Sequence, residues 1–196
     1  MHLTIEVEGG AYAGRVLRAR AREFMAKLGK GKAELSILLT TDGGIRTLNR
    51  RFRGKNAPTD VLSFPAGDEG PLPPGMPRPL GDLAISLDTA RRRAIEDGRS
   101  LSFELSRYLA HGLLHLLDYD HERSEAEARR MARAESRLLG LPGMLADAQG
   151  VSGGGGRSGA RRGPMAIGRG GPDAMQRAPR RVEGRPAPAA PSNRRS

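Results

Sequence analysis

Three histidines fall within eleven residues, in the stretch H111-G-L-L-H115-L-L-D-Y-D-H121. His111 and His115 are four positions apart, so on a helix both imidazoles leave the same face and can reach one metal ion. His121 can join them only if the chain leaves the helix and turns back, and Asp118 favours such a break. Three neutral imidazoles leave a fourth tetrahedral position for water, as in catalytic zinc sites. The spacing therefore predicts one Zn²⁺ ion bound by His111, His115 and His121, which would activate water for hydrolysis.

Two other interpretations of this stretch have to be weighed. The residues can be ordinary helix histidines, but a third histidine just past a helix break, in a chain that otherwise has only His2, argues against that. Zinc proteases of the H-E-x-x-H class carry a glutamate general base beside the first ligand. Gly112 occupies that position here, so the protease interpretation lacks its main residue. A glycine either admits a close ligand or backbone, or allows tight helix packing.

The elements that must position these histidines follow from hydrophobic periodicity and capping signals. Alternation of apolar residues predicts strands at 2–8, 34–40, 61–64 and 83–87, with a proline-rich exposed loop at 65–79. Five helices are predicted. The first spans 15–28, and the second runs to 51 after a cap at Thr41 or Asp42. The third spans 89–97 with Asp88 as its cap, the fourth runs from 101 to about 117 with Ser100 as its cap, and the fifth begins after Ser124 and ends at Gly140. Strands followed by a helical C-terminal half indicate one α+β domain, with about five helices packed on a small sheet of four strands.

The charge and composition divide the chain near residue 150. Residues 151–196 hold ten Arg against Asp173 and Glu183, and ten Gly and six Pro, which predicts a disordered basic tail after a catalytic domain at 1–150. The tail is interpreted either as a solvated extension or as a source of phosphate contacts. The chain has no cysteine, which excludes disulfides and thiolate metal sites. It has no apolar run long enough to span a membrane and no signal-peptide pattern at its start, so a cytoplasmic location is expected.

Four blocks of the sequence resemble the YbeY family of bacterial metal-dependent endoribonucleases. They are LNRRFRG at 48–54, PTDVLSFP at 58–65, LGDLAIS at 80–86 and the histidine stretch at 111–121, with the later Met131 and Glu135. The resemblance covers roughly residues 35–140. It implies a zincin-like, metal-centred α+β fold with a small mixed sheet, and His111, His115 and His121 as zinc ligands. It also implies cleavage of single-stranded RNA in rRNA precursors, with a role in maturing the small-subunit rRNA and hence association with the small ribosomal subunit.

Four further positions bear on this expectation. The functionally important arginine of the family corresponds to Arg53, which could grip the scissile phosphate or could be a solvated arginine of a basic run. Asp60 and Asp120 could each brace a loop or accept a hydrogen bond from a metal-bound histidine. Asp118 replaces a glycine of the family pattern. If its backbone is left-handed, this costs about 1 kcal/mol, or its carboxylate could alter the charge at the metal.

The sequence therefore predicts a zinc-dependent, single-strand-specific endoribonuclease of rRNA processing and ribosome biogenesis. A metallohydrolase of another substrate, such as a peptide, is the first alternative. The second is a non-catalytic ribosome-assembly factor that contains zinc.

Overall fold

The computed structural model describes residues 2–8, 10–67, 70 and 72–141. The predicted basic tail at 151–196 lies outside the described residues, as does the end of the predicted catalytic domain at 142–150. In the described part of the chain there are four strands: β1 (His2–Val7), β2 (Glu34–Thr40), β3 (Val61–Pro65) and β4 (Pro79–Ser86). There are also five helices: α1 (Ala11–Lys27), α2 (Asp42–Arg53), α3 (Leu87–Glu96), α4 (Leu101–Leu116) and α5 (Glu125–Leu139). The predicted α+β class is confirmed.

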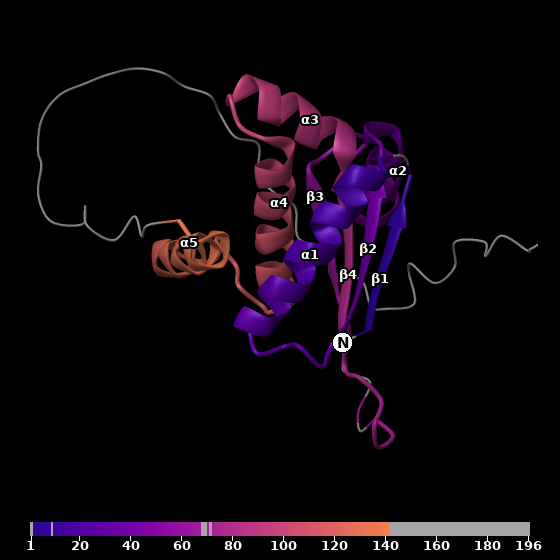
Figure 1. Ribbon diagram of the computed structural model, residues 1–196, viewed down its shortest axis with the longest axis vertical. Coiled ribbons are helices and arrows are strands. Elements are labelled where there is room, and N and C mark those ends of the chain that lie inside the picture. The colour runs from indigo at the N-terminus through magenta and orange to yellow at the C-terminus, as the bar shows by residue number, and fades with distance from the viewer. Residues whose placement is uncertain (1, 9, 68–69, 71, 142–196) are drawn as a thin grey trace, which may run out of the picture.

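The four strands form one mixed sheet in the order β1-β2-β4-β3 (Figure 1). β1, β2 and β4 run parallel, whereas β3 lies at an edge and pairs antiparallel with β4. Gly81 permits the close pairing of β4 with β3. Its φ is +134°, and a Cβ there would lie 2.3 Å from the carbonyl oxygen of Phe64. A side chain at position 81 would therefore push the edge strand away from the sheet.

The two faces of the sheet carry different helices. One face contributes apolar side chains of β2 and β4 to a core shared with α1, α3, α4 and α5, namely Leu35, Ile37, Leu39, Leu83 and Ile85. The other face presents Leu62, Phe64 and Ala84 to α2 in a smaller second cluster. Because side chains alternate along a strand, β3 contributes Val61 to the first core and its neighbour Leu62 to the second. The edge strand β3 thus lies between α4 and α2.

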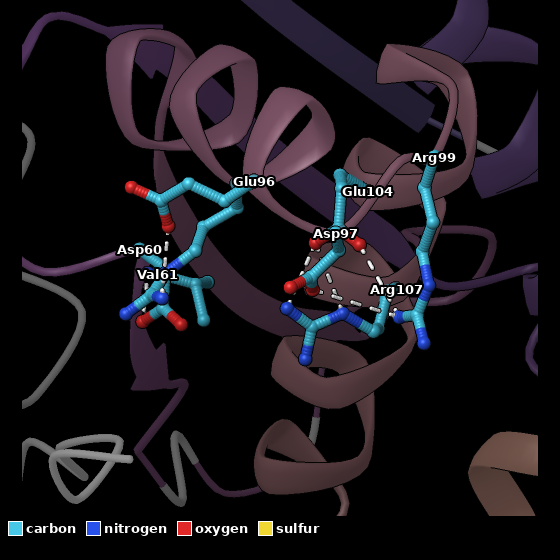
Figure 2. A network of polar contacts seen from close by, with 8 residues as sticks. Asp60, Val61, Glu96, Asp97, Arg99, Glu104 and Arg107 are labelled. Carbon is cyan, nitrogen blue, oxygen red and sulfur yellow. Dashed lines mark hydrogen bonds and ion pairs between the residues drawn. The ribbon is translucent and has the colours of Figure 1, made fainter. Parts of the chain in front are cut away.

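Helix α4 is the most buried helix of the described chain, and polar contacts fix its start. The Ser100 hydroxyl caps it by accepting a hydrogen bond from the backbone N–H of Phe103, as predicted. Glu104, whose side chain is fully buried, accepts hydrogen bonds from Arg107 Nη2 at 2.8 Å and from Arg99 Nη1 at 3.5 Å (Figure 2). Removing these arginines would leave the buried Glu104 carboxylate without a charge partner, which is strongly unfavourable. The network therefore holds the first turns of α4 in place.

Several predicted boundaries were wrong for physical reasons. α1 begins at Ala11, four residues earlier than expected, because its N-cap is Gly10 in a left-handed conformation without a side-chain cap. β4 begins at Pro79, inside the predicted loop, because pairing with β2 extends it. α3 is capped by Ser86, whereas the predicted cap, Asp88, accepts a hydrogen bond from the backbone N–H of Asp42. α2 continues to Arg53, two residues beyond the predicted end, and Thr41 caps it.

None of the described helices combines the length and the apolar character needed to cross a membrane.

Candidate metal centre

The end of α4 turns the chain so that His121 can approach the helix again. The backbone N–H of Tyr119 donates to the Leu114 carbonyl at 3.0 Å, and that of Asp118 donates to the His115 carbonyl at 3.1 Å. Asp118 lies at φ 64°, and it is the one non-glycine residue with positive φ among those described. The helix break expected at this position is confirmed, and Asp118 has the left-handed backbone that was considered for it. Such a turn satisfies carbonyls that the last helical turn would otherwise leave without a donor.

A group of ion pairs braces the loop that follows. The Asp118 side chain is 82% exposed and accepts a hydrogen bond from Arg123 Nη2 at 3.0 Å, so its carboxylate points toward solvent. Arg123 Nε also pairs with Asp120 at 3.1 Å, and Asp120 accepts the backbone N–H of Glu122. Both aspartates therefore support the loop that carries His121, which fits the bracing interpretation of Asp120.

The three histidines lie together at this helix break. One ring nitrogen of each, from His111, His115 and His121, lies within 4.8 Å of the other two. The Nε2 atoms of His111 and His115 are 2.8 Å apart. The centroids of the three rings are 4.5, 5.3 and 5.4 Å apart, so the rings surround a common point. His111 and His115 are buried and His121 is partly exposed, which leaves one side of the group open.

The protonation of the group suits metal binding. Burial, together with the neighbouring His111 and His121, lowers the pKa of His115 to about 4, so this ring is neutral at pH 7. His111 Nδ1 contacts the Glu135 carboxylate, which leaves the opposite ring nitrogen, Nε2, facing the other two histidines. Two imidazole nitrogens then face each other across 2.8 Å. Both nitrogens could therefore bind one cation.

The donor set also fits a metal ion. Within the described part of the chain the group contains three ligand side chains, all of them histidines. The Nδ1 atoms of His115 and His121 are buried and have no hydrogen-bond partner among the described residues. Three imidazoles suit zinc and related transition metals, and three protein ligands leave a position for water or substrate. The three histidines could therefore hold one metal ion with an open coordination position.

Gly112 lies on the side of α4 that faces the sheet. A Cβ at this position would lie 2.8 Å from Leu83 Cδ2 and 3.2 Å from Val61 Cγ2. The carbonyl oxygen of Gly112 also accepts a hydrogen bond from the Ser63 hydroxyl at 3.3 Å. Of the two roles expected for this glycine, tight helix packing is the one that the structure supports. The packing fixes the height of the neighbouring His111 above the sheet.

Arg53 is the last residue of α2 and is half-buried. Burial lowers its pKa to about 10, and the charge of Glu122 opposes part of this shift. The guanidinium is therefore still charged at pH 7, and it lies close enough to interact with the residue that follows His121. Asp60 is not part of the histidine group. It accepts a hydrogen bond from the backbone N–H of Val61 (Figure 2). It also accepts one from the hydroxyl of Thr59, and so braces its own loop.

Sequence reasoning missed the role of Glu135. The residue was noted as part of a family pattern, but its contact with His111 joins positions 24 residues apart on two different helices. The available signal was its place on α5 beside the inward-facing Met131, Ala134 and Leu138. A carboxylate at the edge of a buried helix face often has a specific partner.

A family model and the curated relatives of this chain carry the same family description. A family model described as Endoribonuclease YbeY matches residues 10–141. The chain is 57% identical over 145 residues to Endoribonuclease YbeY of Anaeromyxobacter dehalogenans, covering 74% of this chain and 72% of that protein. It is 54% identical to Endoribonuclease YbeY of Myxococcus xanthus, covering 74% of this chain but only 50% of that longer protein. A solution structure of a Thermotoga maritima protein aligns with a TM-score of 0.48 at 24% identity, covering 70% of this chain and 89% of that one.

Proposed function

Because the chain belongs to the Endoribonuclease YbeY family, we propose that it is a zinc-dependent endoribonuclease that cuts single-stranded RNA during maturation of the small-subunit rRNA. The observation that carries this proposal is the group formed by His111, His115 and His121, whose ring nitrogens lie within 4.8 Å of one another. Membership of the family makes the protein a metal-dependent endoribonuclease. Family membership does not by itself specify the metal, the substrate or the location. We propose zinc as the metal ion, an rRNA precursor as the substrate, association with the small ribosomal subunit, and a cytoplasmic location.

The position of each residue suggests its role in the proposed reaction. His111, His115 and His121 would hold the zinc ion, and Glu135 would orient His111 through its Nδ1. A zinc ion bound there would supply a Lewis acid beside the scissile phosphate. Arg53 would bind a non-bridging oxygen of that phosphate and stabilise the negative charge that builds up in the transition state. The attacking group is either water or the ribose 2′-hydroxyl.

The alternative of a peptide substrate is disfavoured by Gly112. The position at which an H-E-x-x-H protease carries its general base is a glycine packed against Leu83 and Val61. The alternative of a non-catalytic assembly factor is disfavoured by the three-ligand group, because structural zinc sites are closed by four protein ligands.

Incubation of the zinc-loaded full chain with single-stranded RNA, single-stranded DNA and casein under matched conditions tests the function. We expect RNA to be cut and casein to remain intact. Fragments ending in a 2′,3′-cyclic phosphate would identify the 2′-hydroxyl as the attacking group, whereas equally rapid cutting of DNA would identify water. Intact RNA after incubation with protein that carries one zinc ion per chain would overturn the proposal.

Glu135 gives a second test that does not depend on cleavage. Glu135→Ala is expected to lower the affinity for zinc by about 10–100-fold, because a carboxylate that orients a metal-bound histidine typically contributes this much. Competition with a chromophoric chelator measures the change. Glu125→Ala is the matched control, since Glu125 lies on the same helix and pairs with Arg129 at the surface. Equal zinc affinity in the Glu135 variant and the wild type would show that the contact has no role in binding.

A further inference from the structure

Helix α2 carries three arginines on one flank. Arg46, Arg50 and Arg53 follow the spacing i, i+4, i+7, which places them along one side of a helix, about 6 Å and then about 4.5 Å apart along its axis. Arg46 and Arg50 are exposed, and Arg53 is half-buried at the end of the helix. We call Arg46, Arg50 and Arg53 the α2 arginine row.

The flank can be located from the contacts of its neighbours. Ile45, Leu48 and Phe52 form the inward face of α2 against the sheet. At about 100° per residue, Asn49 lies between this face and the row. The Asn49 amide donates to the carbonyl of Ala57 at 2.7 Å, in the segment that leads into β3. The row therefore lies on the flank of α2 that is turned toward the edge strand, and Arg53 brings its C-terminal end to Glu122 beside His121.

Arg46 and Arg50 differ from other surface arginines of the described chain in their ion pairing. Arg93, Arg129 and Arg130 each pair with a glutamate three or four residues away on the same helix. Helix α2 has one acidic residue, Asp42, which is engaged by Ser86, Thr89 and Arg92. Among the described residues, no ion pair involves Arg46 or Arg50. Two exposed cations thus continue the line of Arg53 away from the histidines.

We propose that Arg46 and Arg50 bind the phosphates of the RNA strand on one side of the scissile phosphate, as a continuation of Arg53. The inference rests on the proposed function and adds a substrate-binding surface to it. A charged row at regular spacing suits a sequence-independent backbone contact, because each phosphate carries one negative charge and base edges are not read. The row runs in one direction only, so it extends the bound strand on one side of the cut and not on the other.

The test compares the zinc-loaded full chain with two double variants. Arg46→Gln/Arg50→Gln removes the exposed part of the row, and Arg18→Gln/Arg22→Gln removes two exposed arginines with the same i, i+4 spacing from α1. Glutamine keeps a high helix propensity, and circular dichroism checks that both variants are folded. The probe is a 2′-O-methyl phosphorothioate oligouridylate of about 16 nucleotides, which keeps one charge per linkage and resists cleavage. The basic segment at 151–196 is present in all three proteins, so differences between them report on the substituted residues.

The observed binding constant Kobs for the oligonucleotide is measured at several salt concentrations. In Arg46→Gln/Arg50→Gln we expect the slope of log Kobs against log salt concentration to become shallower by about 1.4, because each lost phosphate contact with a single strand contributes about 0.7. Affinity at low salt is expected to fall about tenfold. With cleavable RNA, KM should rise while kcat stays within about twofold, because the lost contact is equal in ground and transition states. Lengthening the RNA on one side of its cut site should lower KM for the wild type and not for this variant.

Two results would overturn the inference. One is an unchanged slope and KM in Arg46→Gln/Arg50→Gln. The other is an equal loss in Arg18→Gln/Arg22→Gln, which would mean that binding follows net charge alone. Failure of the proposed function is distinguishable from both, because it would leave the binding difference between the two variants intact while the wild type cuts no RNA.

Discussion

Replacement of His115 by alanine is expected to abolish stoichiometric zinc binding and to lower kcat/KM for RNA cleavage by at least about 10³-fold. His115 is buried, is neutral at pH 7 and faces Nε2 of His111 at 2.8 Å, so its loss removes a central ligand. A bound metal ion stabilises the charge of the transition state by several kcal/mol, which sets the size of the effect. Elemental analysis of the purified variant and a fluorescent RNA cleavage assay measure the two quantities.

His2→Ala is the matched control, since His2 is an exposed residue of β1 and its loss should change neither quantity. Because His115 lies in the core, its variant has to be checked for folding by circular dichroism. His121→Ala provides an independent variant, since His121 is partly exposed and lies in a loop, where truncation leaves no large cavity. A folded His121 variant that keeps one zinc ion per chain and the wild-type rate would refute the three-histidine site.

Arg53→Ala is expected to lower kcat by about 10²–10³-fold while leaving the zinc content unchanged. A preorganised cation that meets charge developing on the phosphate contributes about this much, because it acts in a partly desolvated site. Arg53→Lys should recover only part of the loss, since an ammonium group cannot form the bidentate contact of a guanidinium. Single-turnover cleavage with saturating enzyme measures the chemical step separately from binding.

Arg51→Ala is the control for charge at this end of α2. Arg51 is a neighbouring cation in the last turn, but its guanidinium lies over the Phe52 ring at 5.1 Å and not in the row. We expect its kcat to stay close to that of the wild type. Equal rate losses in the Arg51 and Arg53 variants would indicate that α2 contributes only general positive charge, and Arg53 would lose its assigned role.

Local patterns were sufficient to predict the histidine group. The i, i+4 spacing of His111 and His115 needs only a helix, and a helix break within six residues is the simplest way to return His121 to the same place. Asp118 is the local signal for that break, and its φ of 64° bears this out. Helix caps at Ser100 and Ser124 were likewise predicted, since they depend on residues three positions apart.

Features that depend on distant parts of the chain were not predicted. The contact between Glu135 and His111 requires the packing of α5 on α4. The start of β4 at Pro79 depends on its pairing with β2. The antiparallel direction of β3 depends on its pairing with β4. The beginning of α1 was missed because Gly10 provides no side-chain signal. The interaction of Arg53 with Glu122 could not be predicted either, because α2 and the loop that carries His121 are far apart in sequence.

The close approach of Gly112 to Leu83 and Val61 limits how this scaffold can change its chemistry during evolution or by engineering. A single substitution to glutamate would complete the H-E-x-x-H signature of a peptidase, yet it would drive a carboxylate into the interface between the helix and the sheet. Burying such a charge without a partner is highly unfavourable, so the variant would lose its fold before it gained a general base. A change from nucleic acid to peptide hydrolysis would therefore also require α4 to move away from β3 and β4.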